Sequence, residues 1–350
     1  MNKIINKALF YKEWINVRWV TLLTIIVLLY FKVYGVISLL NQNKINIKQV
    51  GTIWTDRWFN NGLYYGGSYY FVMVCIVIIL AIILFIGEKT SETQGFIASM
   101  PFTRKEIILN KWIVGVISLI ISFIVTYIVL SLFYLANINT LNTTLNPYSD
   151  IVKWFFMDIF QYVFIFTFMM MAQAVMGNSI VAAIVGGIII YVPSFILMVV
   201  QDLVVRHYGF VEHIYKTFDK IAGWINIYSY NVTHQEWFNQ EANSGKDMYQ
   251  TFYYTNYKSK LLIFFILTCI FLYLAYLAYK KRNLEYNLRL IVFGNLRCVF
   301  IWGFAICLGL LGGSIFGSEH LRVFGICTVI FIIIGYFISK LLLKVLSAGK

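Results

Sequence analysis

The chain has 350 residues, of which 60% are hydrophobic and only 12% are charged, and its net charge is +13. An ordinary soluble domain has about 25% charged residues, so this composition excludes a soluble globular protein. The basic residues flank apolar runs instead of forming one stripe, which argues against nucleic-acid binding.

Eight apolar runs follow one another along the chain, each near the ~20 residues with which a helix crosses the hydrocarbon core of a membrane. They predict transmembrane helices at residues 19–40, 69–86, 112–136, 154–176, 179–200, 261–279, 298–316 and 323–345. The runs are continuous rather than alternating, so a transmembrane β-barrel is not expected. The predicted fold is an all-α polytopic membrane protein with about eight transmembrane helices in a single domain, residues 1–350.

Residues 1–18 precede the first run and are predicted to form a helix at the membrane interface. Ile4, Ala8, Tyr11 and Ile15 share one face of such a helix, and Trp14 suits the headgroup region. The alternative is a solvated basic tail. Residues 19–200 then hold spans one to five, and residues 261–350 hold spans six to eight.

The polar break between the second and third runs contains two helix starts. Ser91 and Gln94 have the spacing of a capping box, and a second box begins at Thr103. Pro101 prevents one continuous helix through the break. The sequence therefore predicts a short helix at residues 92–100, a turn, and a second helix that runs from Arg104 into the third span.

The short helix would expose Phe96, Ile97 and Met100 beside Glu88 and Glu92. A helix of this length is marginal in water by itself, so we expect it to pack against something. Lipid or the protein itself is one such surface, and a soluble partner on the cytoplasmic side is another. The residues alone leave both interpretations open.

The largest loop, residues 201–260, is predicted to lie outside the cell. Val204, Tyr208, Val211, Tyr215 and Phe218 follow a heptad-like spacing, which indicates either a helix on the outer membrane surface or packing within a small loop domain. By contrast, only residues 176–179 separate spans four and five, so those two helices should form a tight hairpin.

Charge placement predicts the orientation in the membrane. With an even number of spans, both termini lie on one side, and that side collects most of the lysines and arginines. The positive-inside rule then places both termini in the cytoplasm. We expect a multi-pass protein of a bacterial cytoplasmic membrane.

Two ionisable residues lie within spans toward the outer leaflet, Lys32 in the first and Asp158 in the fourth. Such residues are costly in a membrane and each raises a functional hypothesis. They could pair across the bundle or line a polar substrate path. The favoured alternative is that each snorkels separately to the outer interface. In the fifth span, Gly186, Gly187 and Pro193 permit close packing, which is the default interpretation, or a kink.

The motifs of common catalytic sites do not occur. The Lys89-Thr90 pair lacks the glycine loop of a nucleotide-binding P-loop, so ATP hydrolysis would have to come from another chain. The four histidines fall in predicted external loops, where solvated or loop-packed side chains are favoured over a zinc site. The sequence therefore predicts neither an enzyme nor a metal site.

The polar break resembles the first cytoplasmic loop of type-2 ABC (ABC-2) transporter permeases. The residues that carry the resemblance are Glu88, the run Ser99-Met100-Pro101-Phe102-Thr103-Arg104, and Lys111. Three further features agree with the resemblance: Lys12-Glu13, the hairpin near Gly177-Asn178, and KKRNLEYN at 280–287. The last of these, followed by Leu296-Arg297, is similar to bacterial members with a hairpin added after a six-span core. The resemblance covers about 1–200 and 260–300. Met100 stands where leucine is usual, and 201–260 matches nothing in that pattern.

The resemblance implies a coupling helix, residues 91–104, that sits in a groove of a separate ABC ATPase subunit. The implied ATPase-coupling residues are Glu88, Ser91, Glu92, Phe96, Ile97, Met100, Pro101, Thr103 and Arg104. ATP and magnesium would bind to the ATPase and no cofactor to this chain, which would pair with a second permease copy or a paralogue.

The expected function is the permease subunit of an exporter for an amphiphilic or peptidic substrate, such as an antimicrobial peptide, lipid or drug. The alternatives are a membrane sensor or scaffold that binds an external ligand without transport, and an integral membrane enzyme that acts on lipids.

Overall fold

The computed structural model describes residues 7–89, 102–209, 211–239, 248–282, 290–317 and 320–345. Within these ranges, eight helical segments are long and apolar enough to cross a membrane. Their bounds are Lys7–Val50, Tyr69–Lys89, Arg104–Ala136, Ser149–Val175, Ser179–Tyr208, Tyr257–Lys281, Gly294–Phe316 and Leu321–Val345. Each of the eight predicted runs falls on one of these segments, so the all-α polytopic prediction is confirmed.

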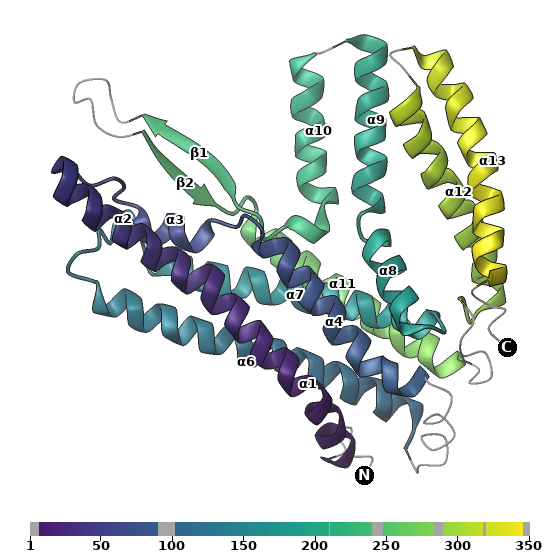
Figure 1. Ribbon diagram of the computed structural model, residues 1–350, viewed down its shortest axis with the longest axis horizontal. Coiled ribbons are helices and arrows are strands. Elements are labelled where there is room, and N and C mark those ends of the chain that lie inside the picture. Colours follow the sequence, from purple (N-terminus) through teal and green to yellow (C-terminus); the bar gives the residue numbers. More distant parts are fainter. Residues whose placement is uncertain are drawn as a thin grey trace. The chain divides into compact units, whose positions relative to one another are not determined.

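The contacts within the chain group it into two compact units (Figure 1). Unit 1 contains Met1–Leu84, Glu106–Thr167 and Ser229–Phe271. Unit 2 contains Phe85–Lys105, Phe168–Tyr228 and Leu272–Lys350. Each unit has its own buried side chains, and each is described by itself.

The first span, in unit 1, is one continuous helical segment of 44 residues. It consists of α1 (Lys7–Leu28), a π-helical stretch η1 (Leu29–Tyr34) and α2 (Gly35–Val50). At 1.5 Å per residue it is about 66 Å long, which exceeds the ~30 Å hydrocarbon core. The helix runs through residue 18 without interruption, since no Gly or Pro near that residue stops it, and the interfacial position of residues 1–18 stays a prediction.

Two further helix boundaries follow the sequence signals. Helix α6 (Arg104–Ala136) begins at the predicted residue and continues without a break into the third span. Helix α7 (Ser149–Val175) is followed by a turn and α8 (Ser179–Ile189), which confirms the tight hairpin. The Asn178 side chain caps α8 by accepting hydrogen bonds from the backbone N–H groups of Ile180 and Val181.

The fifth span is broken, as its proline suggested. Helix α9 (Val192–Tyr208) follows α8 after a short interruption, and Pro193 lies in its first turn, where a missing N–H costs nothing. Gly186 on α8 packs closely, since a Cβ there would lie 2.9 Å from the Ala172 Cβ. Both predicted features of this span, close packing and a kink, are therefore present.

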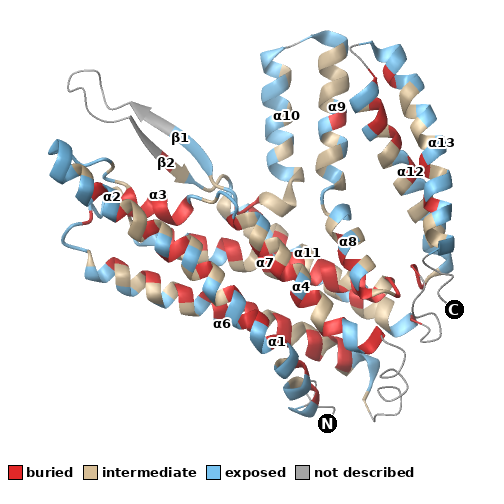
Figure 2. Cartoon of the chain, in the orientation of Figure 1, coloured by how far each residue is buried: buried red, intermediate tan, exposed pale blue. Residues whose placement is uncertain are grey.

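The heptad-like stripe of residues 204–218 does not form one helix. Gly209 has a φ of 75°, which ends α9, and α10 (Glu212–Ile225) then returns beside α9 in unit 2 (Figure 1). The Ser194 hydroxyl donates to Asn226 Oδ1 at 2.6 Å, which ties the end of α10 to the start of α9. None of the α10 residues is buried, as the pale blue and tan colouring of that helix shows (Figure 2).

Several shorter elements of unit 1 lie in the segments that link the spans. Helix α3 (Trp58–Tyr64) precedes α4 (Tyr69–Lys89), and a 3₁₀ turn η2 (Ile227–Ser229) ends where unit 1 resumes. The strands β1 (His234–Asn239) and β2 (Met248–Tyr253) form an antiparallel hairpin with His234 paired to Tyr253. Helix α11 (Tyr257–Lys281) is the sixth span.

The last two spans, α12 (Gly294–Phe316) and α13 (Leu321–Val345), lie side by side in unit 2 (Figure 1). Glycines make this close approach feasible, as small residues commonly do between membrane helices. A Cβ on Gly312 would lie 2.2 Å from Cγ of Phe331, and a Cβ on Gly335 would lie 2.9 Å from the Ala305 Cα. The predicted C-terminal hairpin is thus a packed pair of helices.

Replacing Gly312 by Ala should destabilise the hairpin by about 1–3 kcal/mol, because overpacking forces the Phe331 ring and the backbone to shift. The matched control is Gly303→Ala in the same helix, where an added Cβ meets nothing within 4 Å. Thermal unfolding in detergent measures the melting temperature of each variant, and size-exclusion chromatography checks that each is monodisperse. Equal melting temperatures for the two variants would contradict this packing.

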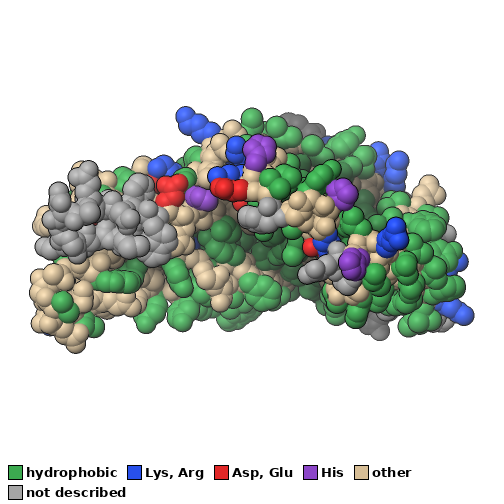
Figure 3. Space-filling view, turned by 90° about the horizontal axis from the view of Figure 1, so that it is seen from above, with side chains coloured by type: hydrophobic (Ala, Val, Ile, Leu, Met, Phe, Trp, Pro, Cys, Tyr) green, Lys and Arg blue, Asp and Glu red, His purple; other side chains and the backbone are tan. Residues whose placement is uncertain are grey.

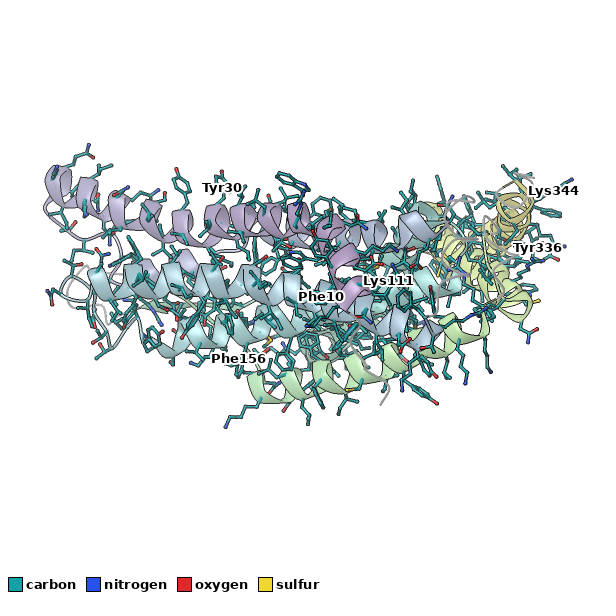
Figure 4. All side chains as sticks on the ribbon, turned by 90° about the horizontal axis from the view of Figure 1, so that it is seen from below. Phe10, Tyr30, Lys111, Phe156, Tyr336 and Lys344 are labelled. Atoms are coloured by element: carbon teal, nitrogen blue, oxygen red, sulfur yellow. The ribbon has the colours of Figure 1, made fainter. Side chains whose placement is uncertain are left out.

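Large hydrophobic side chains remain exposed along the spans. Figure 3 shows them over much of the visible surface, and Figure 4 shows Tyr30 pointing away from the helices that surround it. An exposed apolar surface of this extent suits contact with lipid tails or another membrane subunit, not with water.

Candidate functional site

The end of α4, in unit 2, is held by two buried charged residues. Glu88 is 7% exposed and accepts a hydrogen bond at 2.9 Å from the Tyr279 hydroxyl on α11. Lys89 is 4% exposed and donates to Gln173 Oε1 on α7 at 2.6 Å. Hydrogen bonds that involve an ionised partner are the stronger ones, so these contacts fix the point at which the chain leaves the second span.

The start of α6 is tied to the end of the sixth span. The Arg104 guanidinium donates to the backbone carbonyls of Lys280 at 2.9 Å and Arg282 at 2.6 Å. The last carbonyls of a helix have no intrahelical partner, and a cation is a favourable one. Burial lowers the pKa of the neighbouring Arg282. The positive charge of Arg104 also lowers this pKa, whereas Tyr279 and Glu88 raise it.

A buried ion pair holds the next turn of α6 inside unit 1. Lys111 Nζ lies 2.9 Å from Glu13 Oε1 on α1, and it also donates to the carbonyl of Leu84 on α4. Both charged side chains are almost fully buried, at 1% and 2% exposure. Lys111 and Phe10 of α1 are labelled in Figure 4. Three helices therefore meet at one lysine.

The hydrogen bonds described above involve only some of the predicted coupling residues. Six of those residues lie outside the described part of the chain: Ser91, Glu92, Phe96, Ile97, Met100 and Pro101. Thr103 is exposed directly before α6, and Glu88 and Arg104 are placed as described above. The sequence reasoning missed the partners Tyr279 and Gln173, although a glutamine within a long apolar helix is a detectable signal.

Lys32 and Asp158 belong to a buried polar cluster in unit 1. Each is only 1% exposed, so the interpretation that they snorkel separately to the outer interface is wrong. Lys32 Nζ donates to the Leu63 carbonyl at 2.9 Å and lies 4.0 Å from the centroid of the Tyr69 ring. The Tyr69 hydroxyl donates to Asp158 Oδ2 at 2.5 Å, and this tyrosine therefore links the two charged residues.

A loop segment completes the cluster. Asn231, which follows η2, donates from Nδ2 to Asp158 Oδ1 at 2.9 Å and to the Tyr162 hydroxyl at 3.2 Å. Its side chain is buried. Tyr69 and Asn231 were missed by the sequence reasoning because aromatic residues and asparagines are frequent in this chain, and neither one stands out until the fold brings it to Asp158.

Within the part of the chain that the structure describes, no group of three His, Cys, Asp or Glu side chains is placed to hold a metal ion. The five cysteines are free thiols. The described polar clusters instead consist of a buried ion pair and of charged residues bound to backbone carbonyls, hydroxyl groups or amides, which suits holding helices in position.

Comparison with known proteins gave one result. The profile of a family described as ABC-2 family transporter protein matches residues 9–284, about four-fifths of the chain, and ends before α12 begins. No curated protein and no solved structure gave a match. Permeases of this family have no catalytic activity themselves and work with ABC ATPase subunits. The chain therefore belongs to the ABC-2 transporter family, as a multi-pass permease subunit.

Proposed function

We propose that this permease subunit drives the export of an amphiphilic or peptidic substrate, with residues 91–104 as the coupling helix that receives force from an ATPase. The observation that carries the proposal is that side-chain hydrogen bonds hold the chain at both ends of that segment. Glu88 and Lys89 hold the end of α4, and Arg104 holds the start of α6. A segment with anchored ends transmits a push to the helices instead of absorbing it.

The proposed assembly contains two cytoplasmic ATPase subunits that carry ATP and magnesium, and a second permease that is a copy or a paralogue. Both termini of the chain lie in the cytoplasm. ATP binding favours one arrangement of the permease pair and hydrolysis releases it, so that access to the substrate alternates between the two sides. In this scheme Lys32 and Asp158 line a polar path through the spans.

Purification of the full chain in mild detergent from its native cell tests the partner. We expect a near-stoichiometric protein with a P-loop to co-purify, and Met100→Glu to release it, since a charge in an apolar contact is costly. Recovery of the chain alone, under conditions that keep other transporters intact, would favour a sensor that binds an external ligand without transport.

A separate test addresses the hydrogen bonds from Arg104 to the carbonyls of Lys280 and Arg282. Arg104→Ala should leave the ATPase bound but reduce ATP-driven uptake of a fluorescent amphiphilic dye into inverted vesicles about tenfold, within the usual range of coupling free energies. Lys105→Ala is the matched control, because the neighbouring lysine is also exposed and no contact to the carbonyls of α11 is found for it. Equal uptake by the two variants would contradict a role for the Arg104 contact.

A further inference from the structure

A cavity of about 620 Å³ lies in unit 1, between η1, α2, α3 and the chain that leads into α4. Its volume is within the range of small-molecule sites. Its rim is held in place from α2, where the buried Asn43 side chain both donates to the Thr55 carbonyl at 2.8 Å and accepts from the Thr55 N–H at 3.1 Å. This contact fixes the loop that carries Trp54.

Four glycines line the cavity, and two of them, Gly62 and Gly66, lie too close to their neighbours for a side chain to fit without a shift. A Cβ on Gly62 would lie 2.6 Å from the Val36 Cα, and a Cβ on Gly66 would lie 2.0 Å from the Tyr70 ring. Helix α3 and the following loop therefore pack directly on the helices behind them. The contact at Gly62 is with backbone atoms, so this part of the cavity wall does not depend on a side-chain rotamer.

The lining is aromatic and uncharged. It includes Tyr34, Trp54, Tyr65 and Phe252, with Gln42 and Asn61 as neutral hydrogen-bonding groups. Among the residues that the structure describes, no Asp, Glu, Lys, Arg or His lines the cavity. A charged ligand would lose water here without meeting an opposite charge, which is costly. A purely apolar ligand would leave the amides without partners. The lining thus selects a neutral ligand with both apolar faces and polar edges.

We propose that this cavity is a binding site for a neutral saccharide. A sugar ring presents C–H groups to aromatic faces, whose negative quadrupole attracts them, while its hydroxyl edge can exchange hydrogen bonds with amides. The sugar could be free or could be the headgroup of a glycolipid. This proposal rests on the proposed function, from which it takes two points. Residues 41–68 lie on the outer side of the membrane, and the substrate is amphiphilic.

The site adjoins the polar cluster around Asp158. Gly62 lines the cavity, and the next residue, Leu63, supplies the carbonyl that accepts from Lys32. Ser68 also lines it and precedes Tyr69, which donates to Asp158. A ligand that shifts either backbone segment therefore acts directly on the groups that hold Lys32 and Asp158 together.

The test uses the full chain in phosphatidylcholine nanodiscs, with two probes: soluble maltose, and a fluorescent monoglucosyl diacylglycerol. We expect saturable binding of at least one probe, and about tenfold weaker binding by Trp54→Ala. Trp54 is exposed at the cavity, so its loss should not affect folding. Trp19→Ala is the matched control, an exposed tryptophan on α1 that does not line the cavity and should bind as the wild type does.

Binding of the glycolipid alone identifies a lipid headgroup as the source of the sugar, and binding of maltose as well identifies a site open to free saccharide. Equal binding of diacylglycerol without sugar, preference for a capped uncharged tripeptide, or equal affinities in Trp54→Ala and wild type would each overturn the proposal. Because binding is measured without nucleotide or ATPase, its failure is distinct from a failure to co-purify an ATPase.

Discussion

Lys111→Met should be among the most damaging single substitutions in this protein, with an expected loss of about 3–5 kcal/mol in stability. That is the usual cost of removing one partner from a buried ion pair, since the remaining charge has neither water nor a counter-charge. Glu13, which is 2% exposed inside unit 1, would keep only the half-exposed Lys12, whose Nζ lies 3.5 Å from its Oε1, and would lose its buried partner. The carbonyl of Leu84 would lose its donor as well. Thermal unfolding in detergent measures the effect.

A double-mutant cycle separates the ion pair from general damage to α6. Glu13→Gln combined with Lys111→Met removes both charges, so it should be clearly more stable than the sum of the single changes predicts. The control pair is Glu212 and Lys216 on α10, which also lie within ion-pair distance but are about 70% exposed. Removing either of these should change stability by at most about 1 kcal/mol. Additive effects of the Glu13 and Lys111 substitutions would contradict the buried pairing.

The second large effect is expected for Asp158→Asn. The amide can still accept from the Tyr69 hydroxyl, but Lys32 would lie fully buried without a nearby negative charge. We expect a loss of about 3 kcal/mol, by the same reasoning on unpaired buried charges. Asp219→Asn, at an exposed position on α10, is the control and should leave the melting temperature unchanged.

The double variant Lys32→Met/Asp158→Asn distinguishes a structural role from a transport role. Removing both charges should restore much of the stability that Asp158→Asn loses. If the cluster lines the substrate path, dye uptake into inverted vesicles should stay low although the protein is folded. Recovery of stability together with normal uptake would show that the cluster only holds α4 and α7 to the first span.

Much of the fold could be predicted because each membrane span is a continuous run of apolar residues in the sequence. Hydropathy placed all eight spans, and the capping residues before Arg104 gave the correct start of α6. The continuity of the helix through residue 18 was not evident from the sequence. A change from mixed to apolar composition marks where a span can begin, but it does not by itself interrupt a helix, and no Gly or Pro occurs there.

The site could not be predicted in the same way because its contacts join residues that are far apart in the chain. Glu13 and Lys111 are separated by 98 residues, and Tyr69 and Asp158 by 89. Depth along a span says where a charge lies relative to the membrane, but not which side of the helix faces the bundle. Lys32 was therefore assigned to the outer interface, although its helix face points inward.

The glycine-packed pair α12–α13 has a consequence for how the protein is made. These helices are joined by a few residues and interlock through Gly312 and Gly335, so their contact can form as soon as both have left the ribosome. Their attachment site is already present by then, because Arg206 on α9 donates to the carbonyls of Ser314 and Gly317. The two helices can therefore insert as a preassembled hairpin that docks onto earlier spans, with no long-range search by its individual helices.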